Sequence, residues 1–173
     1  MRLKSLAASL VTIALLFSAL AAQDGQPGEI VSVYDAAKDQ TTVRMRPVTI
    51  ARGGQTEIDW STVLAHTGRS PQAVGFASFQ LIAFSRDGWH FAEGGELVLR
   101  ADGETISRGR IRREMFRASD GLYAESMFIM LPFETFRRIG GARKIDGQLS
   151  GIGFELTAEQ RARLRAFVLR MRP

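Results

Sequence analysis

The amino-acid sequence predicts a mainly β protein: an antiparallel β-sandwich-like domain with a short helix and a C-terminal packing helix. Short segments in which apolar and polar residues alternate run through most of the 173-residue chain. Turn signals such as RDG, EGG, ADG and SDG separate these segments at intervals of roughly 8–12 residues, which is typical of sandwiches and barrels. A sustained helical period appears only near the C-terminus. We expect about eight antiparallel strands.

The first 22 residues have the order of a secretory signal peptide. Arg2 and Lys4 form a short positive head, an apolar stretch runs to about Leu20, and small residues around Ala21 offer cleavage positions. An uncleaved membrane anchor is the alternative, because the apolar stretch just reaches the length that spans a bilayer. The predicted location is therefore the periplasm or the cell exterior.

Behind this leader we expect a linker over residues 23–28 and a single β-rich domain over residues 29–173. Cysteine is absent from the sequence, which excludes disulfides, iron–sulfur clusters and thiolate zinc sites. The formal net charge is +5, and two of these charges, Arg2 and Lys4, belong to the leader. So small a basic excess is no signature of specific nucleic-acid binding. No membrane-spanning segment is predicted after residue 22.

The first half of the domain consists of predicted strands. Residues 29–35 and 41–50 alternate on either side of the turn sequence AAKDQ. Pro47 cannot donate a hydrogen bond to a sheet, so its position predicts an edge or a bulge. Residues 56–68 alternate at period two, as a half-buried strand does. Residues 73–85 form the most apolar run and predict a central strand.

The second half continues this pattern up to a proline. Residues 89–92 (WHFA) and 96–100 (ELVLR) are predicted as hairpin strands between turn signals. Two further extended segments, residues 104–116 and 122–131, follow. A short helix is then predicted from Pro132 to Ile139, because proline favours the first helical position and a glycine pair follows the last.

Residues 142–156 are extended again and predict a last strand. Their apolar residues change from odd to even positions near Gly151. One extra residue in a strand would produce such a change of face, so we predict a β-bulge there.

The C-terminal segment predicts a helix that closes the core. Thr157 and Gln160 have the spacing of a capping box. Leu164, Phe167, Val168 and Met171 form one narrow apolar stripe, arginines flank it on both sides, and the back of the helix is small and apolar, with Ala162, Ala166 and Leu169. A membrane-surface helix has a strongly polar back instead. The stripe therefore indicates packing on a sheet, with arginine stems covering apolar surface.

The alternation of the strands and the helical stripe together predict the core. Its members are Val33, Val43, Trp60, Leu64, Phe76, Phe79, Leu81, Phe84, Leu97, Leu99, Phe128, Leu149, Phe154, Leu164, Phe167 and Val168.

The strongest local candidate for a binding site is RGRIRREMFR. Arg108, Arg110 and Arg112 alternate, so they would share one face of a strand, with Arg113 and Arg117 nearby. Guanidinium groups in a row can hold carboxylates, sulfates or phosphates. The alternative is an edge strand that its charges protect against edge-to-edge pairing. No aromatic residues interleave these arginines, so a platform for single-stranded nucleic acid is not supported.

Catalytic and metal-binding motifs are not found in the sequence. The two histidines, His66 and His90, lack metal-ligand spacing, and neither a G-x-S-x-G elbow nor a phosphate-binding loop is present. We therefore predict no catalytic residue, metal or cofactor. An envelope hydrolase that uses His90 or His66 beside acids such as Asp87 or Asp59 remains the alternative.

Two segments, VYDAAKDQTTVRM and LPFETFRRIGGARKIDGQLSGIGFELTAEQRARLRAFVLRM, resemble a recurring kind of bacterial exported protein of unknown function. The resemblance rests on turn residues and apolar periodicity at both ends of the domain. It implies no activity, cofactor or site residue.

These observations favour a non-catalytic binding or structural module of the bacterial envelope. Its expected partner is another protein or an anionic envelope polymer, contacted through the strand that contains Arg108 to Arg117.

Overall fold

The computed structural model describes residues 25–70, 74–91, 95–111, 113–117 and 121–171, apart from the side chain of Arg110. The predicted signal peptide, the start of the linker and Arg112 lie outside these residues.

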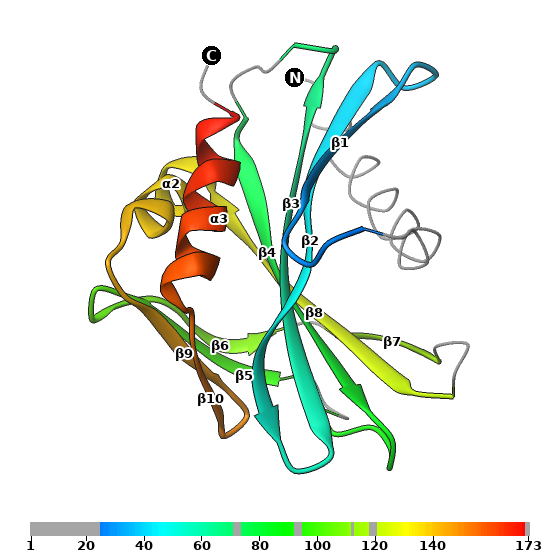
Figure 1. The fold of residues 1–173 in the computed structure, drawn as a ribbon, viewed down its shortest axis with the longest axis vertical. Helices are drawn as coiled ribbons and strands as arrows, with labels where there is room; N and C mark the ends of the chain where they lie inside the picture. The colour runs from blue at the N-terminus through cyan, green and yellow to red at the C-terminus, as the bar shows by residue number, and fades with distance from the viewer. Residues whose placement is uncertain (1–24, 71–73, 92–94, 112, 118–120, 172–173) are drawn as a thin grey trace, which may run out of the picture.

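The described residues form two antiparallel sheets and two helices (Figure 1). The large sheet has the order β1 (Ile30–Asp35), β2 (Gln40–Gly53), β3 (Thr56–Thr67), β4 (Phe76–Ser85), β8 (Tyr123–Pro132) and β7 (Arg113–Arg117). The small sheet has the order β10 (Ile152–Glu155), β9 (Ile145–Leu149), β5 (Gly95–Ala101) and β6 (Glu104–Ile111). The helices are α2 (Phe133–Gly141) and α3 (Ala158–Leu169). The predicted sandwich-like fold class is confirmed, with ten described strands instead of about eight.

The small sheet and both helices lie on the same side of the large sheet (Figure 1). We call the covered side of the large sheet its inner face and the opposite side its outer face. Strand β4 lies between β3 and β8 in this sheet, as its apolar sequence predicted. Trp60 of β3 stacks on Phe79 of β4, with ring centroids 5.7 Å apart, and both rings are buried on the inner face. The core therefore fills the space between the two layers.

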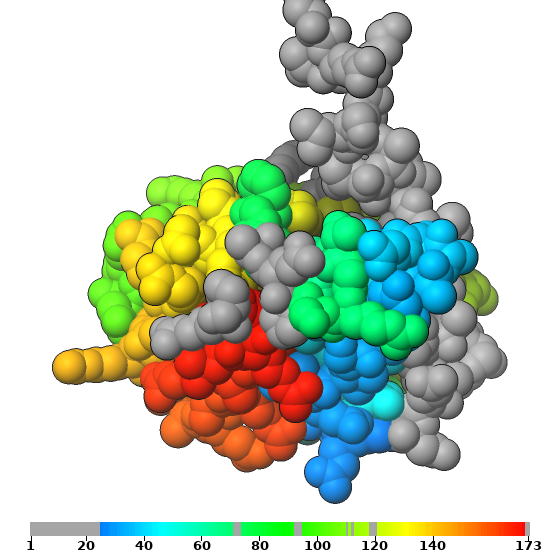
Figure 2. Space-filling view, turned by 90° about the horizontal axis from the view of Figure 1, so that it is seen from above, coloured from blue at the N-terminus to red at the C-terminus, as the bar shows by residue number. Residues whose placement is uncertain are grey.

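Helix α3 closes this core at one end of the molecule. The four apolar stripe residues Leu164, Phe167, Val168 and Met171 are all buried. The ring of Phe167 meets that of Phe136 in α2 edge to face, at 6.0 Å. Figure 2 shows α3 (red) at the surface next to the first strands (blue). The predicted capping box is present, and the prediction of a packing helix is confirmed.

Four residues of the predicted core are not buried. Val33 and Phe76 are 49% and 58% exposed, and Phe84 and Phe128 are half-buried. The pairing of the strands places all four on the outer face, because their register partners there are Thr42, Pro132, Ala124 and Gln80. Counting apolar residues identified the strands correctly but assigned these side chains to the wrong face.

Three local predictions can be compared with the backbone. Of the edge and the bulge predicted at Pro47, the structure has the bulge, because the register of β2 against β3 shifts between Met45 and Val48 and β2 lies between β1 and β3. His90 and Phe91 of the WHFA segment belong to a loop, so the hairpin strand predicted there is wrong. Helix α2 begins one residue after Pro132 and continues through the glycine pair.

The bulge predicted near Gly151 is also wrong, because the chain reverses direction there. Leu149 pairs with Ile152 across a two-residue turn, so residues 145–155 form two strands instead of one. Ser150 and Gly151 have φ values of 45° and 92°, as the two central residues of a type I′ hairpin turn require. Such a turn also moves apolar residues from odd to even positions, which explains the misleading pattern.

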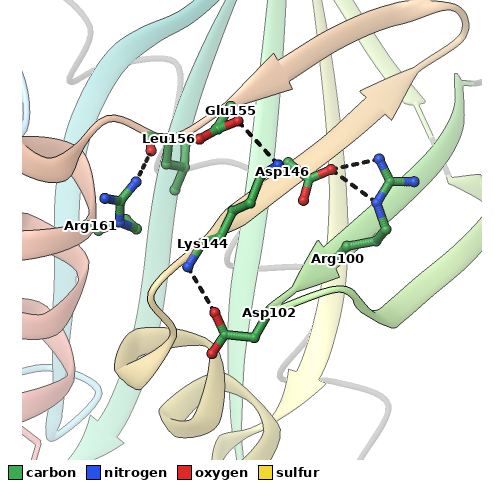
Figure 3. Close-up of polar contacts among 7 residues, drawn as sticks. All are labelled: Arg100, Asp102, Lys144, Asp146, Glu155, Leu156 and Arg161. Carbon is green, nitrogen blue, oxygen red and sulfur yellow. Dashed lines mark hydrogen bonds and ion pairs between the residues drawn. The ribbon is translucent and has the colours of Figure 1, made fainter.

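The side of the small sheet that faces away from the core is charged, and several of its charges are paired (Figure 3). Arg100 donates two hydrogen bonds, of 2.9 and 2.6 Å, to Asp146 on the neighbouring strand. Asp102 in the β5–β6 turn accepts from the backbone nitrogens of Arg143 and Lys144, at 2.9 and 2.8 Å. These contacts fasten the β5–β6 hairpin to the segment between α2 and β9, so the cluster has a structural role.

Candidate binding surface

The structure distributes the predicted arginines over two strands of different sheets. Arg108 and Arg110 belong to β6, the last strand of the small sheet. Arg113 and Arg117 belong to β7, the last strand of the large sheet. Arg112, which lies between them in the sequence, is outside the described residues. The four described arginines therefore do not form one row.

Arg108 occupies the charged side of the small sheet. Arg108 is exposed and lies opposite Val98, and Arg110 stands at the register position opposite Glu96. Both belong to an edge strand, where charged side chains discourage pairing with another sheet. This placement agrees with the edge-strand alternative, and binding by these two arginines stays a prediction.

Arg113 is held by a buried carboxylate on β8. Glu125 is 1% exposed, and its Oε1 forms an ion pair with Arg113 Nη1 at 2.8 Å. The same carboxylate accepts hydrogen bonds from the backbone nitrogens of His90 and Phe91, at 2.8 and 3.0 Å. A buried charge needs such partners, because burial removes its hydration. Glu125 thus fixes the loop after β4 against β7 and β8.

Arg117 belongs to an exposed cluster beside this loop. Its guanidinium lies 4.5 Å from the ring centre of Tyr123 and donates a hydrogen bond of 2.7 Å to the Tyr123 hydroxyl. The ring of Trp89 contacts the ring of Tyr123 edge to face, with the two centroids 4.8 Å apart. On β7 itself, Met115 and Phe116 are 52% and 43% exposed. We call Trp89, Met115, Phe116, Arg117 and Tyr123 the β7 corner.

Three residues of this region were missed from the sequence. Trp89 was assigned to a hairpin strand, and Tyr123 was read only as part of the strand over 122–131. Glu125 carried the clearest signal, because an acid within the apolar segment LYAESMFIML faces the core side of its strand and must find a partner there. The partners of Glu125, His90 and Arg113, could not be identified because the sequence does not show which strands and loops are neighbours in the fold.

The two histidines have different surroundings. His90 is exposed, and its Nε2 lies 2.7 Å from Asp87 Oδ1. The hydrogen bond from His90 lowers the pKa of Asp87 below its ordinary value. His66 is buried on the inner face, with Nδ1 3.0 Å from the Thr67 carbonyl oxygen. Asp59 projects from the opposite face of the same strand, so the structure brings Asp87 to His90 but does not bring Asp59 to His66.

Further features bear on function within the described part of the chain. No three histidine or acidic side chains there gather closely enough to hold a metal ion. None of its helices has the length and apolar character needed to cross a membrane. Comparison of the sequence with protein-family models and with curated proteins gives no match.

Proposed function

We propose that this chain is a non-catalytic binding module of the bacterial envelope that contacts a partner protein through the β7 corner. Residues 1–22 would act as a signal peptide and direct the domain to the periplasm or the cell exterior. The observation that carries the proposal is the exposure of Met115 and Phe116 on an edge strand beside the Arg117–Tyr123–Trp89 cluster.

The composition of the corner is that of a protein interface. Aromatic residues, methionine and arginine are enriched at such interfaces, and tryptophan, tyrosine and arginine contribute most of the binding free energy. The corner is also preorganised. Glu125 holds the loop that contains Trp89, and Tyr123 holds the Arg117 guanidinium, so little side-chain freedom remains to be lost on binding.

An anionic polymer is the less favoured partner. The charge of Arg113 is already compensated by Glu125, and Arg108 lies on a different sheet from Arg117. A polyanion binds best where several cations follow its charges. Heparin affinity measured against salt concentration tests this alternative. Replacement of Arg108, Arg110 and Arg112 by serine should leave both the affinity and its salt dependence unchanged.

A photo-crosslinking experiment tests the proposed protein contact. A photoreactive amino acid replaces Phe116 in the exported protein, and a control replaces Leu169, which is similarly exposed on α3. Position 116 should give a discrete protein adduct that position 169 does not give. The adduct should weaken when Trp89 is changed to alanine. Equal labelling at the two positions, or none at position 116, would contradict the proposal.

The 2.7 Å contact between His90 and Asp87 supports a second candidate, an envelope hydrolase in which this pair acts as a base. Replacement of both His66 and His90 by alanine separates the two candidates. A binding module should keep its cellular phenotype in this variant, whereas a histidine-dependent hydrolase should lose it.

A further inference from the structure

Strand β7 is the last strand of the large sheet, and no described strand lies beyond it (Figure 1). It pairs with β8 along one side, and its residues 114–117 are all exposed. Edge strands usually avoid further pairing through charged side chains, proline or a bulge. The middle of β7 instead carries Met115 and Phe116, whose apolar side chains are 52% and 43% exposed. This edge is therefore accessible and only weakly protected.

The register of the sheet shows which backbone groups of β7 point to the open edge. In an antiparallel sheet, successive residues of an inner strand direct their N–H and C=O groups alternately to one neighbouring strand and to the other. The Phe133 nitrogen donates to the Gly75 carbonyl oxygen at 2.9 Å, and this pair continues the unshifted register of β8 against β4. Odd-numbered residues of β8 therefore bond to β4, and even-numbered residues bond to β7.

The same alternation passes on to β7. Ala124 pairs with Phe116 and Ser126 pairs with Glu114, so Phe116 and Glu114 direct their backbone groups to β8. Met115 lies between them and directs its N–H and C=O away from β8, toward the open edge. These outward groups are the donors and acceptors that a further strand requires.

The side chains at the edge indicate what such a strand would carry. Phe116 projects from the outer face of the sheet, as its register partner Ala124 does, whereas Met115 and Arg117 project from the inner face with Tyr123. The Arg117 guanidinium contacts the ring and hydroxyl of Tyr123, and no acidic side chain among the described residues forms an ion pair with it. Apolar side chains on both faces and one carboxylate would complement this edge.

We propose that the partner protein contributes an extended segment that pairs with β7 as an additional strand of the large sheet. This inference rests on the proposed function and names the form in which the partner binds. In strand addition, backbone hydrogen bonds supply affinity and contacts with alternate side chains supply specificity. The added segment bonds to the outward backbone groups of Met115, covers Met115 and Phe116 with apolar side chains, and places an acidic residue beside Arg117.

A second copy of this chain complements the edge less well. Two β7 strands paired antiparallel about Met115, the middle residue, would place Arg113 of one copy opposite Arg117 of the other. Like charges directly opposite each other destabilise a pair of strands. The guanidinium of Arg117 would also gain no carboxylate from such a pairing.

A proline at position 115 tests the backbone contact. Met115→Pro removes the N–H that points to the open edge but no hydrogen bond between β7 and β8, so the protein should remain folded. Met115→Ala is the matched control, because it removes the side chain and keeps the N–H. Both changes are made in the exported full chain that carries the photoreactive residue at position 116. The yield of adduct should be about tenfold lower with proline than with alanine.

The charge of the added segment is tested at Arg117. In the same chain, Arg117→Glu should lower the yield of adduct more than Arg117→Gln does, because it sets two acids side by side. Equal yields from these two variants would contradict an acidic residue at this position.

Hydrogen exchange provides a measurement that does not depend on the folding of a variant. In the purified adduct, the amide hydrogen of Met115 should exchange at least about tenfold more slowly than in the free chain, because the added strand accepts it. The amide hydrogen of Glu114 points to β8 and should change little. Thermal unfolding by circular dichroism checks that the proline variant is folded.

The outcomes separate this inference from the proposed function. Equal yields from the proline and alanine variants would overturn strand addition and leave the protein contact of the β7 corner in place. If the proline variant does not fold, unchanged exchange at Met115 in the adduct overturns strand addition in the same way. An adduct of twice the mass of the chain would identify a second copy as the occupant and overturn the proposal. Absence of an adduct at position 116 would overturn both inferences.

Discussion

Gln160 joins the N-terminus of α3 to the backbone of Thr49 in β2. Its Oε1 accepts a hydrogen bond from the Thr157 nitrogen at 2.8 Å, and its Nε2 donates one to the Thr49 carbonyl oxygen at 2.9 Å. One side chain thus completes the capping box and connects segments 111 residues apart. The contact explains how the last helix is positioned over the large sheet.

We therefore expect Gln160→Ala to destabilise the protein more than Thr157→Ala does. Loss of the threonine cap should cost about 1 kcal/mol. Loss of the glutamine removes its part of the cap and also leaves the Thr49 carbonyl without its donor, for a total of about 2 kcal/mol. Urea unfolding of the two variants measures the difference. Equal costs would show that the contact with Thr49 contributes nothing.

Phe167→Ala should destabilise the protein by about 3–5 kcal/mol, the range for deletion of a buried aromatic side chain. Phe167 is fully buried and contacts the ring of Phe136. Leu169 lies on the same helix but is 49% exposed, so Leu169→Ala should change stability by less than about 0.5 kcal/mol. Chemical unfolding checks both values. Similar costs at the two positions would contradict the packing of α3 described above.

Glu125→Gln should cost about 3–5 kcal/mol, because it removes the charge of a buried carboxylate that forms an ion pair with Arg113. The hydrogen bonds to His90 and Phe91 should weaken as well, so their amide hydrogens should exchange faster with solvent. Glu114→Gln, on the exposed side of β7, is the matched control and should have little effect. Unchanged exchange at His90 and Phe91 would mean that Glu125 does not hold this loop.

Asp59 should make stability depend on pH. Burial raises the pKa of Asp59 above its ordinary value, and the negative charge of Glu57 raises it further. The hydrogen bond from Thr49 and the positive charge of Arg52 act in the opposite direction. The folded state therefore retains this proton at pH values where the unfolded state has released it. The free energy of unfolding consequently falls as pH rises from the unfolded-state pKa through the folded-state pKa.

Asp59→Asn removes this titration, so the variant should be more stable than the unchanged chain at neutral pH and less sensitive to pH. Thermal unfolding of dilute protein from acidic to neutral pH measures both effects on the isolated chain. If aspartate and asparagine give parallel pH profiles, the burial of Asp59 has no energetic consequence.

Local patterns accounted for much of the fold. The alternation in β3, the proline in β2 and the spacing of Thr157 and Gln160 each predicted the observed element, because short-range sterics and hydrogen bonds determine them. The errors have equally local origins. A type I′ turn at Ser150–Gly151 and a bulge both move the apolar residues from odd to even positions, so the sequence does not distinguish them. Alternation alone also does not show whether Val33 and Phe76 belong to the inner or the outer face.

The surfaces proposed to bind were less accessible to sequence reasoning. RGRIRREMFR reads as one continuous strand, yet β6 and β7 belong to different sheets. Glu125 is 35 residues from the His90 nitrogen that it binds.

The sequence by itself determined that this protein is a cysteine-free, mainly β chain closed by an amphipathic C-terminal helix. These properties depend on composition and on side-chain periods within a few neighbouring residues. The tertiary structure decided which face of each strand is covered, which arginines are neutralised and which polar atoms remain unpaired. Those features arise from pairings between strands distant in the chain, where the free energy depends on packing and desolvation rather than on local conformation.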